Sequence, residues 1–427
     1  MNTKTNPTVL ISGAGIAGTT LAYWLARHGF QPTLVERATG LRSSGNPVDV
    51  RGPAVEVAER MGVLPRLRQA GTRVTALSFV NGSGRQVGRV NMRALQQASD
   101  SREVEVTRTD LATILYEAGR DSAEILFGDT ITALSQDGDG VDITFEKATP
   151  RRFDLVVGAD GLHSTTRRLA FGKESDLVRH MGLYVATMPL DSPADDEHDV
   201  VIHNAPGRMA SLHPVHGRAL AAFIFRHPEV TGFDHRDLAQ HKRVLTDIYS
   251  SDGWRVPELL ERARAADDLW FDSVSQVRVD SWANGRIALL GDAASSVSLF
   301  GDGSTLAMAG AYTLAEELAA TPADPHMAFA RYEARHRTLV DPRQGNVATA
   351  AALMVPATRA GVVVRNAATR LWPTAAAVAR IRNRLTPRGQ GSHRRSPDPD
   401  RAGGHPARDF TQARTYRHRH DLAQRPF

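Results

Sequence analysis

The residues best suited to chemistry begin with a run of glycines near the start of the chain. Gly13, Gly15 and Gly18 stand in the pattern Gly-x-Gly-x-x-Gly, directly after an apolar segment at residues 8–11. In this pattern the first glycine permits a tight turn, the second lets the backbone approach a pyrophosphate, and the third lets a helix pack closely on a strand. The start of the following helix attracts phosphate charge. We therefore predict that a dinucleotide contacts Gly13, Gly15, Ile16, Ala17 and Gly18.

An acidic residue follows at the spacing that nucleotide binding requires. Residues 19–28 predict a helix, and the apolar run 32–37 predicts a second strand. Glu36 lies near the end of that strand, 21 residues after Gly15, where a carboxylate accepts hydrogen bonds from ribose hydroxyls and repels a 2′-phosphate. We include its neighbour Arg37 among the cofactor contacts. The three elements form one βαβ unit, and this context favours cofactor binding over a turn without a ligand.

Two further segments place a carboxylate at the end of a predicted buried strand. Residues 153–157 lead into Gly158-Ala159-Asp160-Gly161, and residues 285–290 lead into Gly291-Asp292. Asp160 either contacts a cofactor or closes a turn with its own side chain. Asp292 can accept hydrogen bonds from a polyol or a ribose.

A predicted helix, residues 304–318, follows Asp292 after a polar loop. Backbone amides at a helix start carry partial positive charge and can face an electron-rich ring edge; the alternative is that Ser304 only caps the helix. We assign ring contacts to Gly301, Gly303, Ser304 and Thr305. This second nucleotide-facing turn lies so far from the glycines that one extended cofactor must touch both, and FAD is such a cofactor.

The length and composition of the chain limit the classes of protein in which these motifs could occur. The 427 residues are enough for two domains, or for one large domain with an inserted layer. Hydrophobic residues make up 41%, which is typical of a globular protein, and no apolar run is long enough to predict a membrane span. The first residues lack a secretory signal pattern. Because cysteine is absent, we exclude disulfides, thiolate catalysis and cysteine-bound metal, and we expect no metal site and a cytoplasmic location.

The basic charge is concentrated at the end of the chain. Residues 376–427 hold twelve Arg, no Lys, four Asp and no Glu, a net of +8, so the remaining residues carry +5 − 8 = −3. We expect a basic tail without a packed core. The alternative is a contact with nucleic acid or an anionic surface, which no nucleic-acid motif supports.

The pattern of strands and helices predicts an α/β fold with an inserted sheet. From residue 178 to 225 several short strands are separated by Pro, Gly and Asp turns, which indicates an antiparallel sheet inserted into the nucleotide-binding domain. We assign residues 1–72, 101–177 and 275–345 to a discontinuous FAD-binding domain, 73–100 and 178–274 to a substrate-binding domain, 346–375 to a C-terminal helical segment, and 376–427 to the tail.

Taken together, the three motifs resemble those of the FAD-dependent aromatic hydroxylases, the class A flavoprotein monooxygenases, over roughly residues 8–345. Within that family the chain looks most similar to tetracycline-degrading and antibiotic-tailoring monooxygenases. The resemblance implies a Rossmann-like FAD-binding domain of the GR2 type, similar to para-hydroxybenzoate hydroxylase, with an inserted antiparallel sheet and C-terminal helices.

The resemblance also implies roles for particular residues. Gly13, Gly15 and Gly18 hold the FAD pyrophosphate, and Glu36 binds the adenosine ribose. Arg108 matches the arginine that reaches the flavin phosphate and ribityl region. Asp160 would lie between FAD and NAD(P)H, Asp292 would contact the ribityl chain, and residues 301–305 would lie under the pyrimidine edge of the flavin.

The chain departs from the common family pattern in the flavin-edge segment. Ser295 replaces a frequent histidine, Ser298-Leu299 replaces a proline, and the loop before Gly301 is about one residue shorter. These differences concern the contacts at the flavin edge. Thr166 stands where valine is common after the Asp-Gly motif, a difference from which we expect little.

The implied reaction is carried by the flavin rather than by a catalytic side chain. NAD(P)H reduces FAD, O₂ gives a flavin C4a-hydroperoxide, and an aromatic or polyketide-like small molecule is hydroxylated. The partners are a small-molecule substrate and O₂, without nucleic acid or integral membrane contact, and the protein is a monomer or homodimer. One alternative is an FAD-dependent reductase or dehydrogenase without oxygen insertion. Another is a non-enzymatic nucleotide-binding scaffold that acts through its tail.

The inserted sheet should supply the substrate pocket. Its two histidines could bind or ionise a phenol, or they could be ordinary sheet residues, and because strand side chains alternate, only about half of the candidates can face the pocket. Arg51 could reach the flavin or the substrate, or it could be a solvated strand-end residue. The candidates are Arg51, Met188, His203, Met209, His213, Phe223, Phe225 and Phe300.

Overall fold

The structure is a computed structural model that describes residues 6–41, 46–92, 102–296 and 302–369. Two predicted site residues, Phe300 and Gly301, lie outside the described residues. The same holds for the predicted tail at 376–427 and for the last residues of the predicted C-terminal helical segment.

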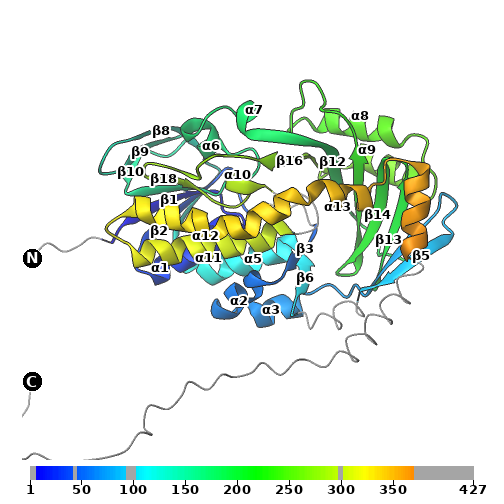
Figure 1. Cartoon of the computed structure of the whole chain (residues 1–427), viewed down its shortest axis with the longest axis horizontal. Coiled ribbons are helices and arrows are strands. Elements are labelled where there is room, and N and C mark those ends of the chain that lie inside the picture. The colour runs from blue at the N-terminus through cyan, green and yellow to red at the C-terminus, as the bar shows by residue number, and fades with distance from the viewer. Residues whose placement is uncertain (1–5, 42–45, 93–101, 297–301, 370–427) are drawn as a thin grey trace, which may run out of the picture. The chain divides into compact units, whose positions relative to one another are not determined.

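A six-stranded sheet carries the glycine motif and both carboxylate motifs (Figure 1). Its order is β17-β18-β11-β1-β2-β7, with all neighbours parallel except the short edge pair β17–β18. Because parallel strands end at one edge, the segments that follow β1, β11 and β18 meet there. The strands are β1 (Thr8–Ser12), β2 (Gln31–Glu36), β7 (Glu124–Phe127), β11 (Leu155–Gly158), β17 (Ala283–Asn284) and β18 (Ile287–Leu289).

Alternating side chains of β1 bury both faces of this sheet. Val9 and Ile11 join a core with the helices on one face, whereas Leu10 joins a second core with a three-stranded sheet on the other face. The helices are α1 (Ile16–Arg27), α5 (Arg108–Gly119), α11 (Asp302–Ala320) and α12 (Pro325–Gly345). The second layer contains β8 (Ile131–Gln136), β9 (Val141–Phe145) and β10 (Arg151–Phe153).

A seven-stranded sheet joins two distant parts of the chain. Its order is β16-β12-β15-β14-β13-β4-β5, and all neighbours are antiparallel except β13 and β4. The first part gives β4 (Ala76–Val80) and β5 (Gln86–Asn91). The second gives β12 (Val178–Leu190), β13 (Asp199–Ala205), β14 (Arg208–Val215), β15 (Arg218–Arg226) and β16 (Trp270–Val277). The predicted α/β fold with an inserted sheet is therefore confirmed.

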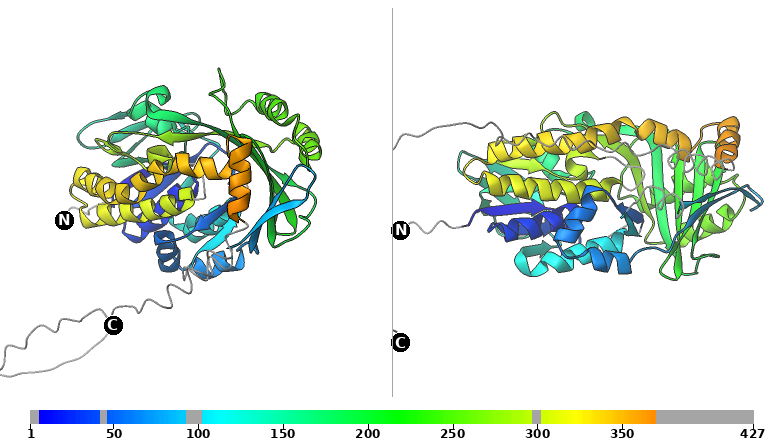
Figure 2. Two further views of the ribbon diagram at one scale, coloured as in Figure 1. Left: turned by 45° about the vertical axis from the view of Figure 1, so that its right-hand side comes forward. Right: turned by 60° about the horizontal axis from the view of Figure 1, so that its bottom comes forward.

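The two faces of this sheet have different covers. Helices α8 (Leu238–Tyr249) and α9 (Val256–Ala265) pack on one face and form a core with its large side chains. On the opposite face, Met209, Ile224 and Val274 contact Ala351 of α13 (Val347–Met354) and Val355. Figures 1 and 2 show α12 and α13 running from the six-stranded sheet to this second sheet.

Hydrogen bonds to backbone carbonyls fasten the last residue of α13 and the two residues after it to the seven-stranded sheet. Asn204 Nδ2 donates to Met354 O at 2.9 Å, Arg226 Nε donates to Val355 O at 2.7 Å, and Gly207 N donates to Pro356 O at 2.8 Å. A helix at Arg359–Thr369 follows. Across the described residues no single helix is long and apolar enough to cross a membrane; α13 and Arg359–Thr369 meet that length and composition only as a pair bent by 87°.

Some predicted elements differ from the observed ones. Helix α11 begins at Asp302 rather than Ser304, so Ser304 lies inside its first turn and is not its cap. A two-stranded sheet, β3 (Pro47–Val50) with β6 (Val104–Thr107), was not predicted. The other short helices are α2 (Pro53–Arg60), α3 (Leu64–Gln69), α6 (Thr165–Ala170), α7 (Glu174–Leu177), α10 (Asp292–Ser295) and the 3₁₀ turn Arg120–Ser122.

Candidate cofactor and substrate sites

The glycine motif has the geometry of a phosphate-binding turn. Gly13 adopts φ +102° and donates its N–H to Val35 O at 2.7 Å. A Cβ on Gly13 would lie 2.5 Å from Ala159 O, and one on Gly18 would lie 1.9 Å from Gly13 O, so both positions require glycine. A Cβ on Gly15 would meet no atom within 4 Å. The space before the first turn of α1 is therefore open, and a pyrophosphate fits there.

Glu36 lies beside the same turn. Its Oε2 accepts from Ala14 N and its Oε1 accepts from Ala38 N, both at 2.9 Å. A carboxylate offers about four acceptor positions, so each oxygen can still accept from a ribose hydroxyl. Arg37 is exposed and donates from Nη2 to Thr165 Oγ1 at 3.1 Å, which ties the end of β2 to the start of α6.

Asp160 is bound by the protein's own donors. Its Oδ2 accepts from Ser12 Oγ at 3.2 Å and from Thr166 N and Oγ1 at 2.9 and 3.0 Å, while Oδ1 accepts from Ser164 Oγ. These bonds join β1, the turn after β11 and helix α6. Asp160 thus stabilises this turn with its own side chain, and its predicted contact with the cofactor stays a prediction. Thr166 matters more than predicted, because its hydroxyl makes a bond that valine cannot make.

The sequence interpretation gave no role to Arg167, which lies in α6, seven residues after Asp160. Its side chain is buried, with 1% of its surface exposed, and burial lowers the pKa of its guanidinium. Nη1 donates to Ala293 O at 3.0 Å and Nη2 donates to Leu162 O at 2.5 Å. Arg167 therefore links the Asp160 turn to the segment that carries Asp292. The short distance in sequence between Asp160 and Arg167 was the signal that could have indicated this role.

The Gly291-Asp292 turn lies against the start of α1. Gly291 adopts φ +63°, and a Cβ there would lie 3.1 Å from Ala17 Cβ. Asp292 Oδ1 lies 3.7 Å from the position of a Cβ on Gly303, in the first turn of α11. Burial raises the pKa of the Asp292 carboxyl, while the charge of Arg108 opposes that rise. The structure therefore brings together the glycine motif, Asp292, Arg108 and the start of α11.

The hydroxyls at the start of α11 bind the protein backbone. Ser304 Oγ and Thr305 Oγ1 donate to Asp49 O at 2.9 and 3.0 Å, and Arg51 N donates to Thr305 Oγ1 at 3.2 Å. These side chains fix β3 against α11. What this turn can offer a ring is its backbone amides, because the first four N–H groups of a helix have no partner within it.

The predicted substrate residues divide between the two faces of the seven-stranded sheet. Met209 and His213 lie on the face that carries α13, where Ser211 Oγ and His213 Nε2 are 3.0 Å apart. Burial lowers the pKa of His213 to about 4. The imidazole is therefore neutral at pH 7, and it can exchange hydrogen bonds with a hydroxyl.

Four other candidates must be corrected, because they lie on the face covered by α8 and α9. Met188, Phe223 and Phe225 are fully buried in that core, and the Phe223 ring packs edge-on against Tyr249 at 5.1 Å. His203 is buried on the same face, 6.0 Å from Trp254 between ring centroids. Strand alternation predicts that the candidates divide between two faces, but both faces carry helices and Met209 is itself buried on the α13 side, so alternation alone does not show which face meets a ligand.

A cavity of about 610 Å³ lies beside the Asp160 turn, between α7, β12, β16 and the loop 229–235. His163 forms part of its wall, with Nδ1 2.8 Å from Glu174 Oε1 and Nε2 3.2 Å from Asp272 Oδ1. Burial opposes the charge on His163, but the two carboxylates outweigh burial and raise its pKa to about 9. Its ring stacks on His235 at 3.8 Å.

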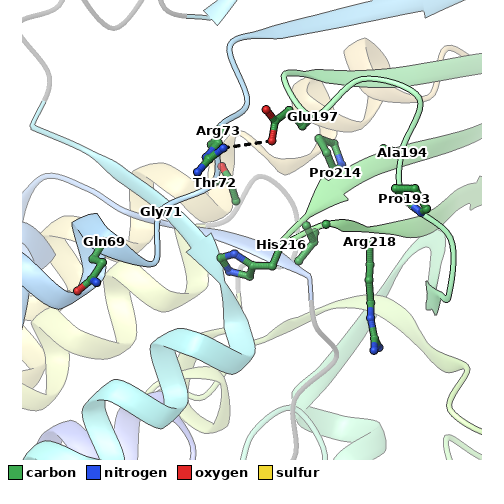
Figure 3. Close-up of a pocket in the computed structure, with 12 residues that line it drawn as sticks. Gln69, Gly71, Thr72, Arg73, Pro193, Ala194, Glu197, Pro214, His216 and Arg218 are labelled. Carbon is green, nitrogen blue, oxygen red and sulfur yellow. Dashed lines mark hydrogen bonds and ion pairs between the residues drawn. The ribbon is translucent and has the colours of Figure 1, made fainter.

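A second cavity of about 380 Å³ lies between the end of α3, residues 71–73 and the tip of the β14–β15 hairpin (Figure 3). Arg73 and Glu197 pair across it at 3.3 Å. The hairpin tip is held by His216, whose Nε2 lies 2.8 Å from Asp110 Oδ2. None of the predicted site residues lines this cavity. Across the described parts of the chain, no group of three or more His, Cys, Asp or Glu residues could hold a metal ion.

The parallel sheet, the glycine turn, Glu36 and Asp292 together define a flavoprotein fold that binds an extended dinucleotide. The family described as "FAD binding domain" matches residues 6–338. An uncharacterized protein of Mycobacterium tuberculosis is 41% identical over 341 residues, which are 79% of this chain and 91% of that protein. A flavin-dependent monooxygenase of Legionella longbeachae is 35% identical over 342 residues, covering 79% and 87%.

Solved structures agree with this assignment. The crystal structure of tetracycline destructase Tet(51) matches with a TM-score of 0.75 and 31% identity, over 88% of this chain and 97% of that chain. The chain belongs to the FAD binding domain family, as a class A flavoprotein monooxygenase. It is an FAD-dependent enzyme, and the alternative without oxygen insertion is not favoured.

Proposed function

We propose that the enzyme uses NAD(P)H and O₂ to hydroxylate an aromatic or polyketide-like small molecule. The observation that carries the proposal is the meeting of three features at one edge of the sheet: the open space at Gly15, the Asp292 carboxylate and the start of α11. The likeness to a tetracycline destructase supports a polycyclic substrate class. When bound, FAD would accept the reducing electrons from NAD(P)H and would activate O₂.

The chain's own residues hold the cofactor in this proposal. The α1 amides and dipole bind the pyrophosphate after Gly15, and Glu36 accepts from the adenosine ribose. Burial raises the pKa of the Asp292 carboxyl, and Arg108 lies close enough for its charge to oppose that rise. A cation and an acceptor therefore stand together where the ribityl phosphate chain would pass. The amides of Gly303 and its neighbours stabilise negative charge on the ring edge, worth about 0.3–1 kcal/mol and more when buried.

The substrate wall is the sheet face that carries Met209, Ser211 and His213. An apolar wall with one neutral imidazole suits a planar molecule bearing a hydroxyl group. The neutral state matters, because a charged imidazole would bring water into a site that must stay dry. Residues 354–356 are bound to β13, to β15 and to Gly207 in the β13–β14 turn. In this proposal they cover one end of the same face and help to exclude water.

The cavity beside the Asp160 turn is the proposed entry for NAD(P)H. Tyr184 and Phe233 offer ring surfaces, and His163 is protonated at neutral pH because its pKa is raised to about 9. We expect His163→Gln to raise the KM for NAD(P)H severalfold while the FAD affinity stays unchanged. An unchanged KM for NAD(P)H would show that the co-substrate does not bind in this cavity.

The whole proposal is tested with the purified protein. It should be yellow, with the absorption spectrum of bound FAD, and a panel of phenols and polyketides should contain a compound that stimulates NAD(P)H oxidation. The product of that compound should gain one oxygen by mass. A colourless protein that cannot be reconstituted with FAD would contradict the proposal.

A further inference from the structure

An acidic residue at the start of α11 is held between two arginines. Asp302 Oδ1 accepts from Arg51 Nε at 3.1 Å and Nη2 at 2.7 Å. Arg343 Nε, from the last turn of α12, lies 3.4 Å from the same oxygen. Less than a third of each of the three side chains is exposed, so water screens this cluster less than a surface ion pair.

Gln344, the next residue of α12, binds the backbone on the N-terminal side of the flavin-edge segment, at Ser296. Gln344 Nε2 donates to Ser296 O at 3.2 Å and to Val277 O at 3.1 Å, and its backbone O accepts from Gln276 Nε2 at 2.6 Å. Two consecutive residues of α12 thus contact the end of β16, the residue after α10, and the first residue of α11. The end of α12 therefore fixes the relative positions of these three elements.

The charges in this cluster are closely balanced. Asp302 and Asp49, which lies 3.4 Å from Arg51 Nη1, contribute two negative charges, and Arg51 and Arg343 contribute two positive ones. Burial opposes the charge on Arg51, but the neighbouring carboxylates, Asp302 foremost, together outweigh burial and raise its pKa. The α11 start adds about half a positive charge. Glu103 also acts on Arg51 but is exposed, so water screens it. Without Arg343 the summed charge of these groups and the helix start becomes negative.

We propose that Arg343 is a positioning residue that keeps the start of α11 electropositive and thereby favours the reduced over the oxidised flavin. The proposal rests on the proposed function, in which the pyrimidine edge of FAD lies at the α11 start. Gln344 supports Arg343 by holding the end of α12 in place. A helix start with a carboxylate at its first position would otherwise repel the negative charge that the ring gains on reduction.

The test measures FAD affinity and the flavin midpoint potential in variants of the full chain. Arg343→Gln should bind reduced FAD about tenfold less well relative to oxidised FAD, which lowers a two-electron potential by about 30 mV. Arg343→Lys should recover most of the shift. Asp302→Asn should move the potential in the opposite direction. Arg331→Gln is the matched control, because Arg331 is an exposed arginine on the same helix, and it should change nothing.

The opposite shifts of the midpoint potential expected for Arg343→Gln and Asp302→Asn distinguish an electrostatic effect from a disturbed structure. A merely structural role would weaken FAD binding in both Arg343→Gln and Asp302→Asn and would move both potentials alike, and this result would overturn the proposal. Unchanged potentials in both variants would overturn it as well. If the unmodified protein binds no FAD, the proposed function itself fails, and thermal unfolding of the apoproteins shows whether each variant is folded.

Discussion

The open space at Gly15 leads to a prediction that separates folding from cofactor binding. Gly15 has φ −76° and ψ −169°, an extended conformation that alanine adopts, and its Cβ would meet nothing within 4 Å. We therefore expect Gly15→Ala to cost at most about 1 kcal/mol of unfolding free energy, the usual difference between glycine and alanine at a helix N-cap.

The same methyl group would occupy the space where the pyrophosphate approaches the backbone. Losing one hydrogen bond to a charged group costs about 1.5–3 kcal/mol, so the Kd for FAD should rise about 10- to 100-fold. The matched variant is Gly18→Ala, whose Cβ would lie 1.9 Å from Gly13 O. That clash requires backbone movement, so Gly18→Ala should lower the unfolding free energy of the apoprotein by about 1–3 kcal/mol or more.

Two measurements decide the outcome. Urea unfolding of the apoproteins, followed by circular dichroism, gives the stability difference, and titration with FAD, followed by flavin fluorescence, gives the Kd. If Gly15→Ala binds FAD as tightly as the unmodified chain, the pyrophosphate does not lie at this turn and the reasoning from the open space is wrong. A strong loss of stability in Gly15→Ala would instead contradict the observation that a Cβ at this position has room.

Three further predictions concern titratable residues. Because burial raises the pKa of Asp292, its charge disfavours the folded state, so Asp292→Asn should raise the Tm of the apoprotein while the Kd for FAD increases about tenfold. His163 has a folded pKa of about 9 against 6.5 unfolded, so its stabilisation, at most about 3 kcal/mol, is complete below pH 6.5 and disappears as pH rises through 9; urea unfolding should show this loss, and His163→Gln should not. His213→Phe should raise the substrate KM without changing FAD affinity, and because the pKa of His213 is about 4, kcat/KM should show no ionisation of this residue between pH 6 and 9.

The sequence could predict the turns that form the proposed cofactor site, because the requirements of these turns are local. Gly13 and Gly18 are required by atoms of the same turn or of the neighbouring strand, and a strand followed by a carboxylate is visible at Asp160 and Asp292. The parallel order then places these turns at one edge without further information. The fold class followed from the same βαβ unit and from the change to short strands after residue 178.

The proposed substrate wall could not be predicted in the same way. Alternation along β14 and β15 separates Met209 from Phe223, but only the packing of the helices shows that Phe223 lies beneath α8 and α9 and Met209 beside α13. Large aromatic residues proved to be core residues beneath α8 and α9. Arg343 lies 41 residues after Asp302 and carries no local pattern, so its contact with the α11 start depends on how α12 packs.

Isotopically labelled O₂ provides the most direct test of the central claim. Once a compound that stimulates NAD(P)H oxidation is found, the reaction is run under labelled O₂ and the product is examined by mass spectrometry. We expect the product to contain one labelled oxygen atom. A product that forms with continued NAD(P)H oxidation but carries no label would show that the enzyme does not insert oxygen, and would contradict the account.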